Sequence, residues 1–208
     1  MMLLSLTILL AIICLVYSDD EFLPNGLIEH PGMRAGYLTN ETKIDINFNS
    51  SDINDYINKY DSTSSAVYGV DVSSSISSTA ASCLVSSSMS FIIPRGYRST
   101  GSVDTNVCTT LKNAKTAGIS TRDVYMFPCP TCSASAASQM STLVTYLKAN
   151  CASYWSGRIW LDIEGSSYWI GSTTSNKAWY QNLVDSCSTY SVTCGVYSSS
   201  TQWSAIFG

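Results

Sequence analysis

Two acidic residues stand one residue apart in a short apolar stretch, Trp160-Leu161-Asp162-Ile163-Glu164-Gly165. If this stretch is a β-strand, Asp162 and Glu164 project to the same face, with backbones about 6 to 7 Å apart. Two crowded carboxylates repel each other, so one of them holds its proton more tightly and can act as an acid near neutral pH. Cleavage of a glycosidic bond uses such a pair, in which one group protonates the departing oxygen and the other stabilises or attacks the developing oxocarbenium centre. The pair therefore indicates glycoside hydrolysis.

Other reactive side chains are scarce in the same part of the chain. Only six acidic residues follow position 64, against eight basic ones. One of them, Asp71, stands near the end of an earlier apolar run, where it could serve a site or cap a helix. Arg95 ends another run and could orient a carboxylate or a sugar substituent, or only form a salt bridge. The sole histidine, His30, lies far upstream, which argues against a Ser-His or Cys-His catalytic arrangement.

The elements that must position these residues are five short apolar, β-branched or aromatic runs, which predict β-strands. The runs are AVYGVDV (66–72), FIIPRGY (91–97), DVYMFPC (123–129), RIWLDIEG (158–165) and CGVYSS (194–199). Three segments between them have helical spacing. Their apolar positions are Val107, Leu111 and Ala114, followed by Gly118; Met140, Leu143, Val144 and Leu147; and Trp179, Tyr180, Leu183, Val184 and Cys187. Strands and helices that alternate in this way predict βαβ units, a parallel sheet and an α/β fold.

A parallel sheet can be an open, doubly wound sheet or a closed barrel. The sequence has neither GxGxxG nor GxxxxGK[ST], which disfavours the nucleotide-binding forms of the open sheet. A barrel of the TIM type gathers its functional groups at the carboxyl ends of its strands, and polar residues end these runs. We therefore expect a β/α barrel.

Five motifs in order give a specific resemblance. GVDVS, FIIPRGY, the stretch from NAKTAGI to DVYMFPCPTC, WLDIEG and GVYSSSTQW resemble family 25 of the glycoside hydrolases, in its eukaryotic, amoeba- and nematode-like lysozyme branch. The resemblance covers residues 66–208. It implies a flattened β/α barrel with N-acetylmuramidase activity on bacterial peptidoglycan. It also implies a monomeric enzyme that needs neither a cofactor nor a metal.

The resemblance also assigns roles to residues of this sequence. Glu164 matches the family's acid/base, Asp162 its partner carboxylate, which orients the N-acetyl group of the substrate, and Asp71 an acid that helps to shape the site. Further candidates for sugar contact are Arg95, Tyr125, Tyr197 and Trp203, the last by stacking on a pyranose ring. Packing in the core is the alternative for the three aromatic side chains.

The N-terminal region has a different character. Residues 1–18, MMLLSLTILLAIICLVYS, are apolar but too short to span a membrane, and they predict a signal peptide. Residues 19–64 carry nine acidic side chains against three basic ones, and the two glycosylation sequons Asn40-Glu41-Thr42 and Asn49-Ser50-Ser51. We expect an exposed acidic extension here and the catalytic domain at 65–208. The protein would then be secreted, or delivered to lysosomal or phagosomal vesicles, with no stable membrane association.

The chain has eight cysteines, of which Cys14 would leave with the signal peptide. The other seven predict a disulfide framework with one unpaired thiol. The family to which the resemblance points continues through further strands after GVYSSSTQW. We therefore expect a C-terminally shortened barrel with an open, aggregation-prone edge and a depleted site.

Two alternatives stay open at this point. Cys129-Pro130-Thr131-Cys132 follows a strand and precedes a helical segment, as the redox pair of a thioredoxin-type oxidoreductase does. A sugar-binding module without catalysis is the other alternative, although the three acids argue against it. The basic residues form no stripe of the kind that binds nucleic acid.

Overall fold

The structure is a computed structural model that describes residues 36–37 and 68–208. The predicted signal peptide and nearly all of the predicted extension, including both sequons, lie outside the described residues. No helix in the described part of the chain is long and apolar enough to cross a membrane.

The centre of the fold is a sheet in which all five predicted strands are confirmed. Parallel neighbours follow the order β8, β7, β6, β3 and β2. Their bounds are Tyr68–Val72 (β2), Met89–Arg98 (β3), Val124–Met126 (β6), Arg158–Asp162 (β7) and Thr193–Tyr197 (β8). Three strands of two residues extend the sheet: β1 (Gly36–Tyr37) pairs antiparallel with β8, while β4 (Ser102–Val103) and β5 (Thr121–Arg122) pair with β3.

Helices follow the strands along the chain. The three predicted helices are confirmed as α4 (Val107–Ala117), α5 (Ala136–Asn150) and α6 (Thr173–Thr189). The structure adds α3 (Ser78–Ser86), the short 3-10 helix η1 (Ser166–Tyr168) and α7 (Ser200–Phe207). Serine begins four of these helices: the side chains of Ser77, Ser135, Ser172 and Ser199 each accept a hydrogen bond from a backbone N–H of the first turn. This satisfies one of the donors that a helix start leaves unpaired.

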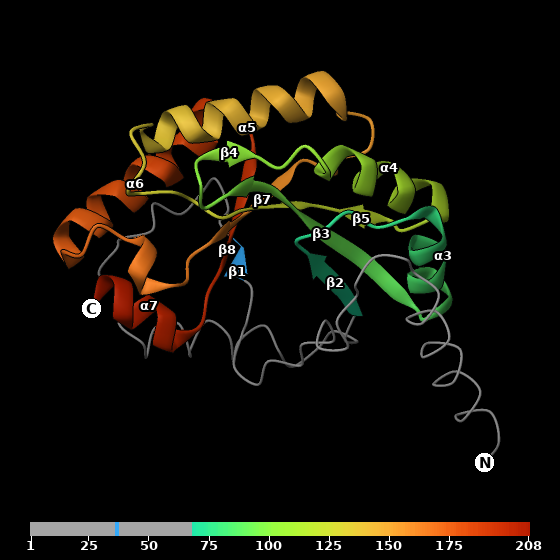
Figure 1. Ribbon diagram of the computed structural model, residues 1–208, viewed down its shortest axis with the longest axis horizontal. Helices are drawn as coiled ribbons and strands as arrows, with labels where there is room; N and C mark the ends of the chain where they lie inside the picture. Colours follow the sequence, from blue (N-terminus) through green and yellow to red (C-terminus); the bar gives the residue numbers. More distant parts are fainter. Residues whose placement is uncertain (1–35, 38–67) are drawn as a thin grey trace, which may run out of the picture.

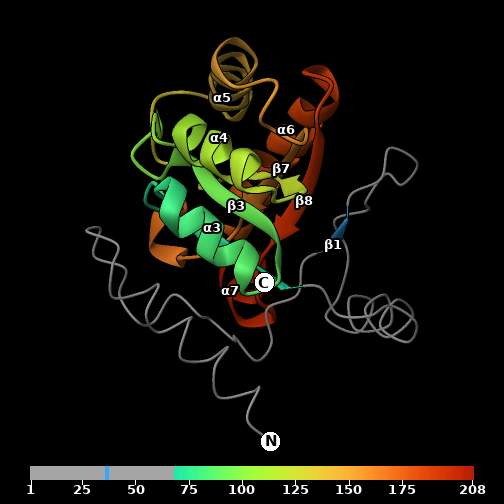
Figure 2. The same cartoon turned by 90° about the vertical axis from the view of Figure 1, so that its right-hand side faces the viewer.

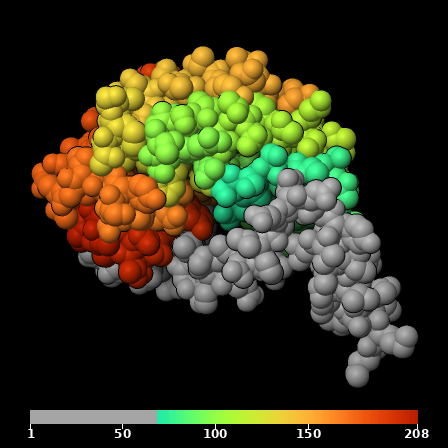
Figure 3. All heavy atoms as spheres, viewed as in Figure 1, coloured from blue at the N-terminus to red at the C-terminus, as the bar shows by residue number. Residues whose placement is uncertain are grey.

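The sheet is curved, and the long helices lie on one side of it. Figure 1 shows α4 and α5 along this side, with α3 and α6 towards its two ends, and Figure 2 shows the same layering from the side. In the space-filling view of Figure 3 these helices form most of the visible surface and hide the sheet. In the described residues the sheet stays open, because its order ends at β2 on one side and β1 on the other. The fold is therefore a flattened, unclosed β/α barrel.

The core lies between the helices and the face of the sheet that they cover. Val124, Met126, Ile159 and Leu161 point from the strands into a cluster with apolar side chains of α5 and α6. A second cluster, which includes Val72 and Ile92, lies under α3 and α4. Because side chains alternate along a strand, the residues between these apolar positions point to the other face, which we call the inner face.

Three disulfides link described residues. They are Cys108–Cys151, Cys129–Cys132 and Cys187–Cys194. Cys83 is disulfide-bonded as well, and no cysteine of the described chain is free. The expectation of an unpaired thiol concerned the chain without residues 1–18, and it stays a prediction.

Candidate functional site

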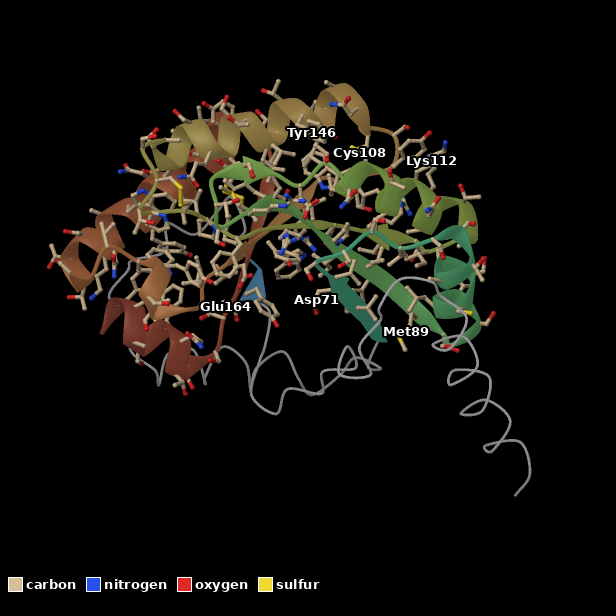
Figure 4. The ribbon with its side chains drawn as sticks, viewed as in Figure 1. Asp71, Met89, Cys108, Lys112, Tyr146 and Glu164 are labelled. Atoms are coloured by element: carbon tan, nitrogen blue, oxygen red, sulfur yellow. A yellow bond between two sulfur atoms is a disulfide. The ribbon has the colours of Figure 1, made fainter. Side chains whose placement is uncertain are left out.

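The strand register brings the predicted polar residues together on the inner face. Arg95 on β3 lies opposite Tyr125 on β6, and Asp162 on β7 lies opposite Tyr197 on β8. Asp71 on β2 lies opposite Ile93, which shares its face with Arg95. Figure 4 shows Asp71 and Glu164 on the side of the sheet away from α4 and α5. Residues from all five parallel strands thus meet at the carboxyl end of the sheet, as expected for a β/α barrel.

Glu164 does not lie on the strand itself, which corrects one expectation. Strand β7 ends at Asp162, and Glu164 belongs to the loop that leads to η1. This loop is held by hydrogen bonds on both sides of Glu164: Ile163 N donates to Tyr197 O at 2.8 Å, and Gly165 N donates to Gln202 Oε1 at 2.9 Å. The carboxylate is therefore placed by a fixed loop rather than by the alternation of a strand.

Burial separates the two carboxyl groups of the pair. Asp162 is 5% exposed, whereas Glu164 is only partly buried. Burial, followed by the charges of Glu164 and Asp71, raises the pKa of Asp162 to about 8 from an ordinary value of 3.8. Its Oδ1 atom is buried and makes no hydrogen bond. Asp162 is therefore a buried group that holds its proton more tightly than an ordinary aspartate, whereas Glu164 is more accessible.

Two tyrosines belong to the same electrostatic cluster. Burial raises the pKa of the Tyr197 hydroxyl, and the charges of Asp71, Asp162 and Glu164 raise it further. The pKa of the Tyr125 hydroxyl is also raised, chiefly by burial, with Arg95 acting in the opposite direction. Both hydroxyls therefore remain neutral and can donate or accept hydrogen bonds beside the carboxylates.

Comparison with known proteins shows the family to which the chain belongs. The family model described as lysozyme-like protein 1 matches residues 62–208. The chain belongs to this family. It is 45% identical over 144 residues to "Probable GH family 25 lysozyme 2" from Dictyostelium discoideum, with 69% of this chain and 66% of that protein covered. It is 39% identical over 147 residues to "Lysozyme-like protein 5" from Caenorhabditis elegans, with 70% and 66% covered. The chain thus spans just under two thirds of the length of these relatives.

A solved structure is similar to this lysozyme-like chain in fold. It is the catalytic domain of endolysin ply40 from bacteriophage P40 of Listeria monocytogenes. The TM-score is 0.51 at 14% sequence identity, with 69% of this chain and 68% of that chain covered. At this identity the likeness concerns the fold alone.

Arg95 forms a salt bridge, which was one of its predicted roles. Its Nε atom lies 3.0 Å from Asp104 Oδ2, and its Nη2 atom donates to Ser73 O at 2.9 Å. Arg98 binds the other carboxylate oxygen of Asp104 at 2.9 Å. Burial by itself raises the pKa of Asp104, but the hydrogen bonds from Arg98 and Arg95 outweigh it, and the pKa is lowered. Asp104 therefore fixes the Arg95 guanidinium beside Tyr125.

Asp104 was only weakly indicated by the sequence. It is one of the six acids after position 64, but its partners are nine and six residues away on β3.

Trp203 lies in a different environment from the other predicted sugar contacts. It is on α7, where its ring centroid is 5.5 Å from that of Tyr180 and 4.6 Å from that of Phe207. Both partners belong to the core between the sheet and the helices. The structure thus brings Asp71, Asp162, Glu164, Tyr125 and Tyr197 together but not Trp203.

Sequence reasoning missed the residues that fill the inner face below the carboxylates. Trp160 Nε1 donates to the buried Asp123 Oδ2 at 3.1 Å, and Arg158 Nη1 lies 3.6 Å from the same oxygen. The Trp160 ring lies over Gly195 of the next strand. This arrangement closes the floor of the site with packed side chains.

The geometry also bears on the redox alternative. Cys129 and Cys132 form a disulfide, but α5 begins only at Ala136 and is capped by Ser135. A redox cysteine needs the N-terminal turn of a helix, or a neighbouring cation, to lower the pKa of its thiol. Here Gln139 holds the loop instead, since its side chain accepts from Cys129 N and donates to Cys129 O. This arrangement favours a structural link over a redox pair.

Proposed function

We propose that this chain is a secreted lysozyme that hydrolyses the β-1,4 bond between N-acetylmuramic acid and N-acetylglucosamine in bacterial peptidoglycan. The observation that carries the proposal is the cluster of Asp71, Asp162 and Glu164 at the carboxyl ends of the strands, where Asp162 is buried and its pKa is raised. The lysozyme names of the relatives support the same reaction. No candidate residue precedes Asp71, so we assign catalysis to residues 65–208.

The different exposure of the two carboxyl groups indicates which of them acts as the acid. Glu164 is the more exposed group and is suited to reach the glycosidic oxygen, protonate it and release the leaving sugar. Because the two groups interact, the proton belongs to the pair and not to one residue alone. A substrate that draws the proton onto Glu164 leaves Asp162 as a carboxylate with a free buried oxygen.

That oxygen supports a role for the substrate's own N-acetyl group. Asp162 Oδ1 has no hydrogen-bond partner and can accept the amide N–H of the sugar. The amide oxygen then attacks the anomeric carbon while the bond to the leaving oxygen breaks, which gives a cyclic oxazolinium ion. Water opens this ring and gives its proton to Glu164, so the enzyme returns to its starting state. Such substrate-assisted hydrolysis is a known variant of the two-carboxylate scheme.

The disulfides support a proposal about the compartment in which the protein acts. Three disulfides among the described residues fit an oxidising compartment, outside the cell or within vesicles. We propose that the chain is a monomer that needs no cofactor, and that Tyr125 and Tyr197 contact the sugar through their hydroxyls.

The test is the Glu164→Gln variant of the full chain, assayed for clearing of bacterial cell walls. We expect wild type to clear the walls and the variant to lose nearly all activity at unchanged stability, because Gln keeps the shape but cannot give a proton. Asp185→Asn is the matched control, since Asp185 is an exposed acid on α6 whose carboxylate accepts a hydrogen bond from Gln181. Mass analysis of the released fragments should find N-acetylmuramic acid at the new reducing ends.

Two outcomes would contradict the proposal. More than a few per cent of wild-type activity in Glu164→Gln would remove Glu164 as the acid. Wild type that binds cell walls without clearing them would favour the sugar-binding module.

A further inference from the structure

An aromatic side chain that the proposed reaction does not use lies beside Glu164. Tyr168, on η1, is 47% exposed and is one of three large apolar or aromatic residues with such exposure in the described chain, with Val85 and Ile170. Its ring lies against Gly165, the residue next to Glu164: a Cβ built on Gly165 would come within 2.7 Å of Tyr168 Cδ2. Gly165 has a φ of 63°, a conformation that glycine adopts at little cost.

The ring is held from a second strand. Phe127 directly follows β6, and its centroid lies 5.2 Å from that of Tyr168, with the planes at 74°. Edge-to-face contacts of this kind are favourable and orient both rings. The Tyr168 side chain is therefore a fixed aromatic surface across the ends of β6 and β7, and not a freely rotating one.

The neighbouring residue, Trp169, holds the loop in place and leaves Tyr168 exposed to solvent. Trp169 is 5% exposed, its ring packs against Trp179 and Phe207, and its Nε1 atom donates to Glu164 O at 3.3 Å. The buried indole thus anchors the loop and ties it to the backbone of Glu164. Tyr168 is presented to solvent from this anchor, at a fixed place relative to the proposed acid.

We propose that Tyr168, supported by Phe127, is a stacking subsite for a pyranose ring of the glycan next to the bond that Glu164 protonates. The apolar C–H face of a pyranose fits an aromatic ring, and sugar sites combine such surfaces with a few polar groups that fix orientation. Here the polar groups are the carboxylates and tyrosine hydroxyls of the inner face. The subsite rests on the proposed function, since it takes the glycan as substrate, and it adds a residue that positions the sugar without taking part in proton transfer.

The test compares Tyr168→Ala, Tyr168→Phe and Ile170→Ala in the full chain. Ile170 is the matched control because it lies two residues away in the same loop and is 43% exposed. On soluble peptidoglycan fragments, Tyr168→Ala should raise KM about 3- to 10-fold while the pH profile of kcat keeps its shape. Tyr168→Phe should restore the KM, because it keeps the ring, and Ile170→Ala should behave as wild type.

Failure of this inference is distinguishable from failure of the proposed function. Equal KM values for wild type and Tyr168→Ala, or a Tyr168→Phe variant as poor as Tyr168→Ala, would overturn the stacking subsite while the hydrolase stands. If wild type does not hydrolyse the fragments, calorimetric binding of the same fragments to wild type and Tyr168→Ala still tests the subsite. A weaker binding of Tyr168→Ala supports it, and equal affinities overturn it.

Discussion

At the scale of single residues, Asp162 is the group whose chemistry depends most on where the fold places it. An ordinary aspartate is charged at neutral pH, but burial and two neighbouring acids raise the pKa of this one to about 8. The folded chain thus binds the Asp162 proton more tightly than the unfolded chain does. This costs stability wherever the unfolded chain has already released the proton.

The first prediction follows from the sign of this shift. The stabilising contribution of the Asp162 proton is complete below pH of about 4, declines as the pH rises, and is lost as the pH passes about 8. Asp162→Asn keeps a neutral group at every pH. At pH 8 the variant should therefore be more stable than wild type, by an amount on the order of a few kcal/mol at most, and the two should converge at pH 4. Denaturant unfolding at a series of pH values measures this.

The control for this measurement is Asp185→Asn, because it changes an exposed carboxylate. Its unfolding free energy should follow that of wild type across the same pH range. If the Asp162→Asn and wild-type curves also run parallel, Asp162 does not retain its proton.

The residues of the site were predictable to different degrees. Asp162, Glu164 and Asp71 could be proposed for the candidate site because acids are scarce and stand at the ends of apolar runs. The loop position of Glu164 could not, since it depends on the bond from Gly165 N to Gln202, 37 residues away. The same holds for Trp160 and Asp123, whose pairing requires two neighbouring strands in register.

At the scale of elements, the close approach of β7 and β8 depends on one glycine. The backbone of Gly195 lies under the Trp160 ring, and a Cβ at this position would be 2.5 Å from Trp160 Cε3. The ring cannot move freely, because its Nε1 atom is bonded to Asp123.

We therefore predict that Gly195→Ala destabilises the fold by about 1 to 3 kcal/mol, the usual cost of overpacking. In a Trp160→Leu background the same substitution should cost less, since the ring it collides with is absent. A double-mutant cycle on the unfolding free energy measures this coupling. Strictly additive effects would mean that the Trp160 ring is not what excludes a side chain at position 195.

Helices α3 and α7 could not be predicted from the sequence, and the reason is physical. The long helices α4, α5 and α6 repeat apolar residues at helical spacing and could be predicted. In α3, STAASCLVS, only Ala81 is buried, so small residues replace the apolar stripe. In α7 only Ile206 and Phe207 are buried. Both helices begin at a serine cap, which is a weak signal in a chain so rich in serine.

At the scale of the whole molecule, disulfides join helices and strands that the open sheet by itself does not hold together. Cys108 at the start of α4 is linked to Cys151 at the end of α5, across 43 residues. Cys187 on α6 is linked to Cys194 on β8, across 7 residues. The long link constrains the unfolded chain more than the short one does.

The corresponding prediction concerns stability. Replacing Cys108 and Cys151 by Ala should lower the free energy of unfolding by about 2 to 4 kcal/mol, and replacing Cys187 and Cys194 should cost less. Thermal and denaturant unfolding of the two double variants decides the order. An equal or reversed order would show that local strain or packing, and not loop length, governs these links.

The long disulfide also determines what a protease can do to this molecule. The Cys108–Cys151 bond encloses the loop after β6 that carries Phe127, together with all of α5. A single cut between these cysteines opens the backbone but leaves both pieces covalently joined. In a compartment filled with digestive enzymes, such a nicked chain would remain one covalent molecule, and its two pieces would separate only after reduction.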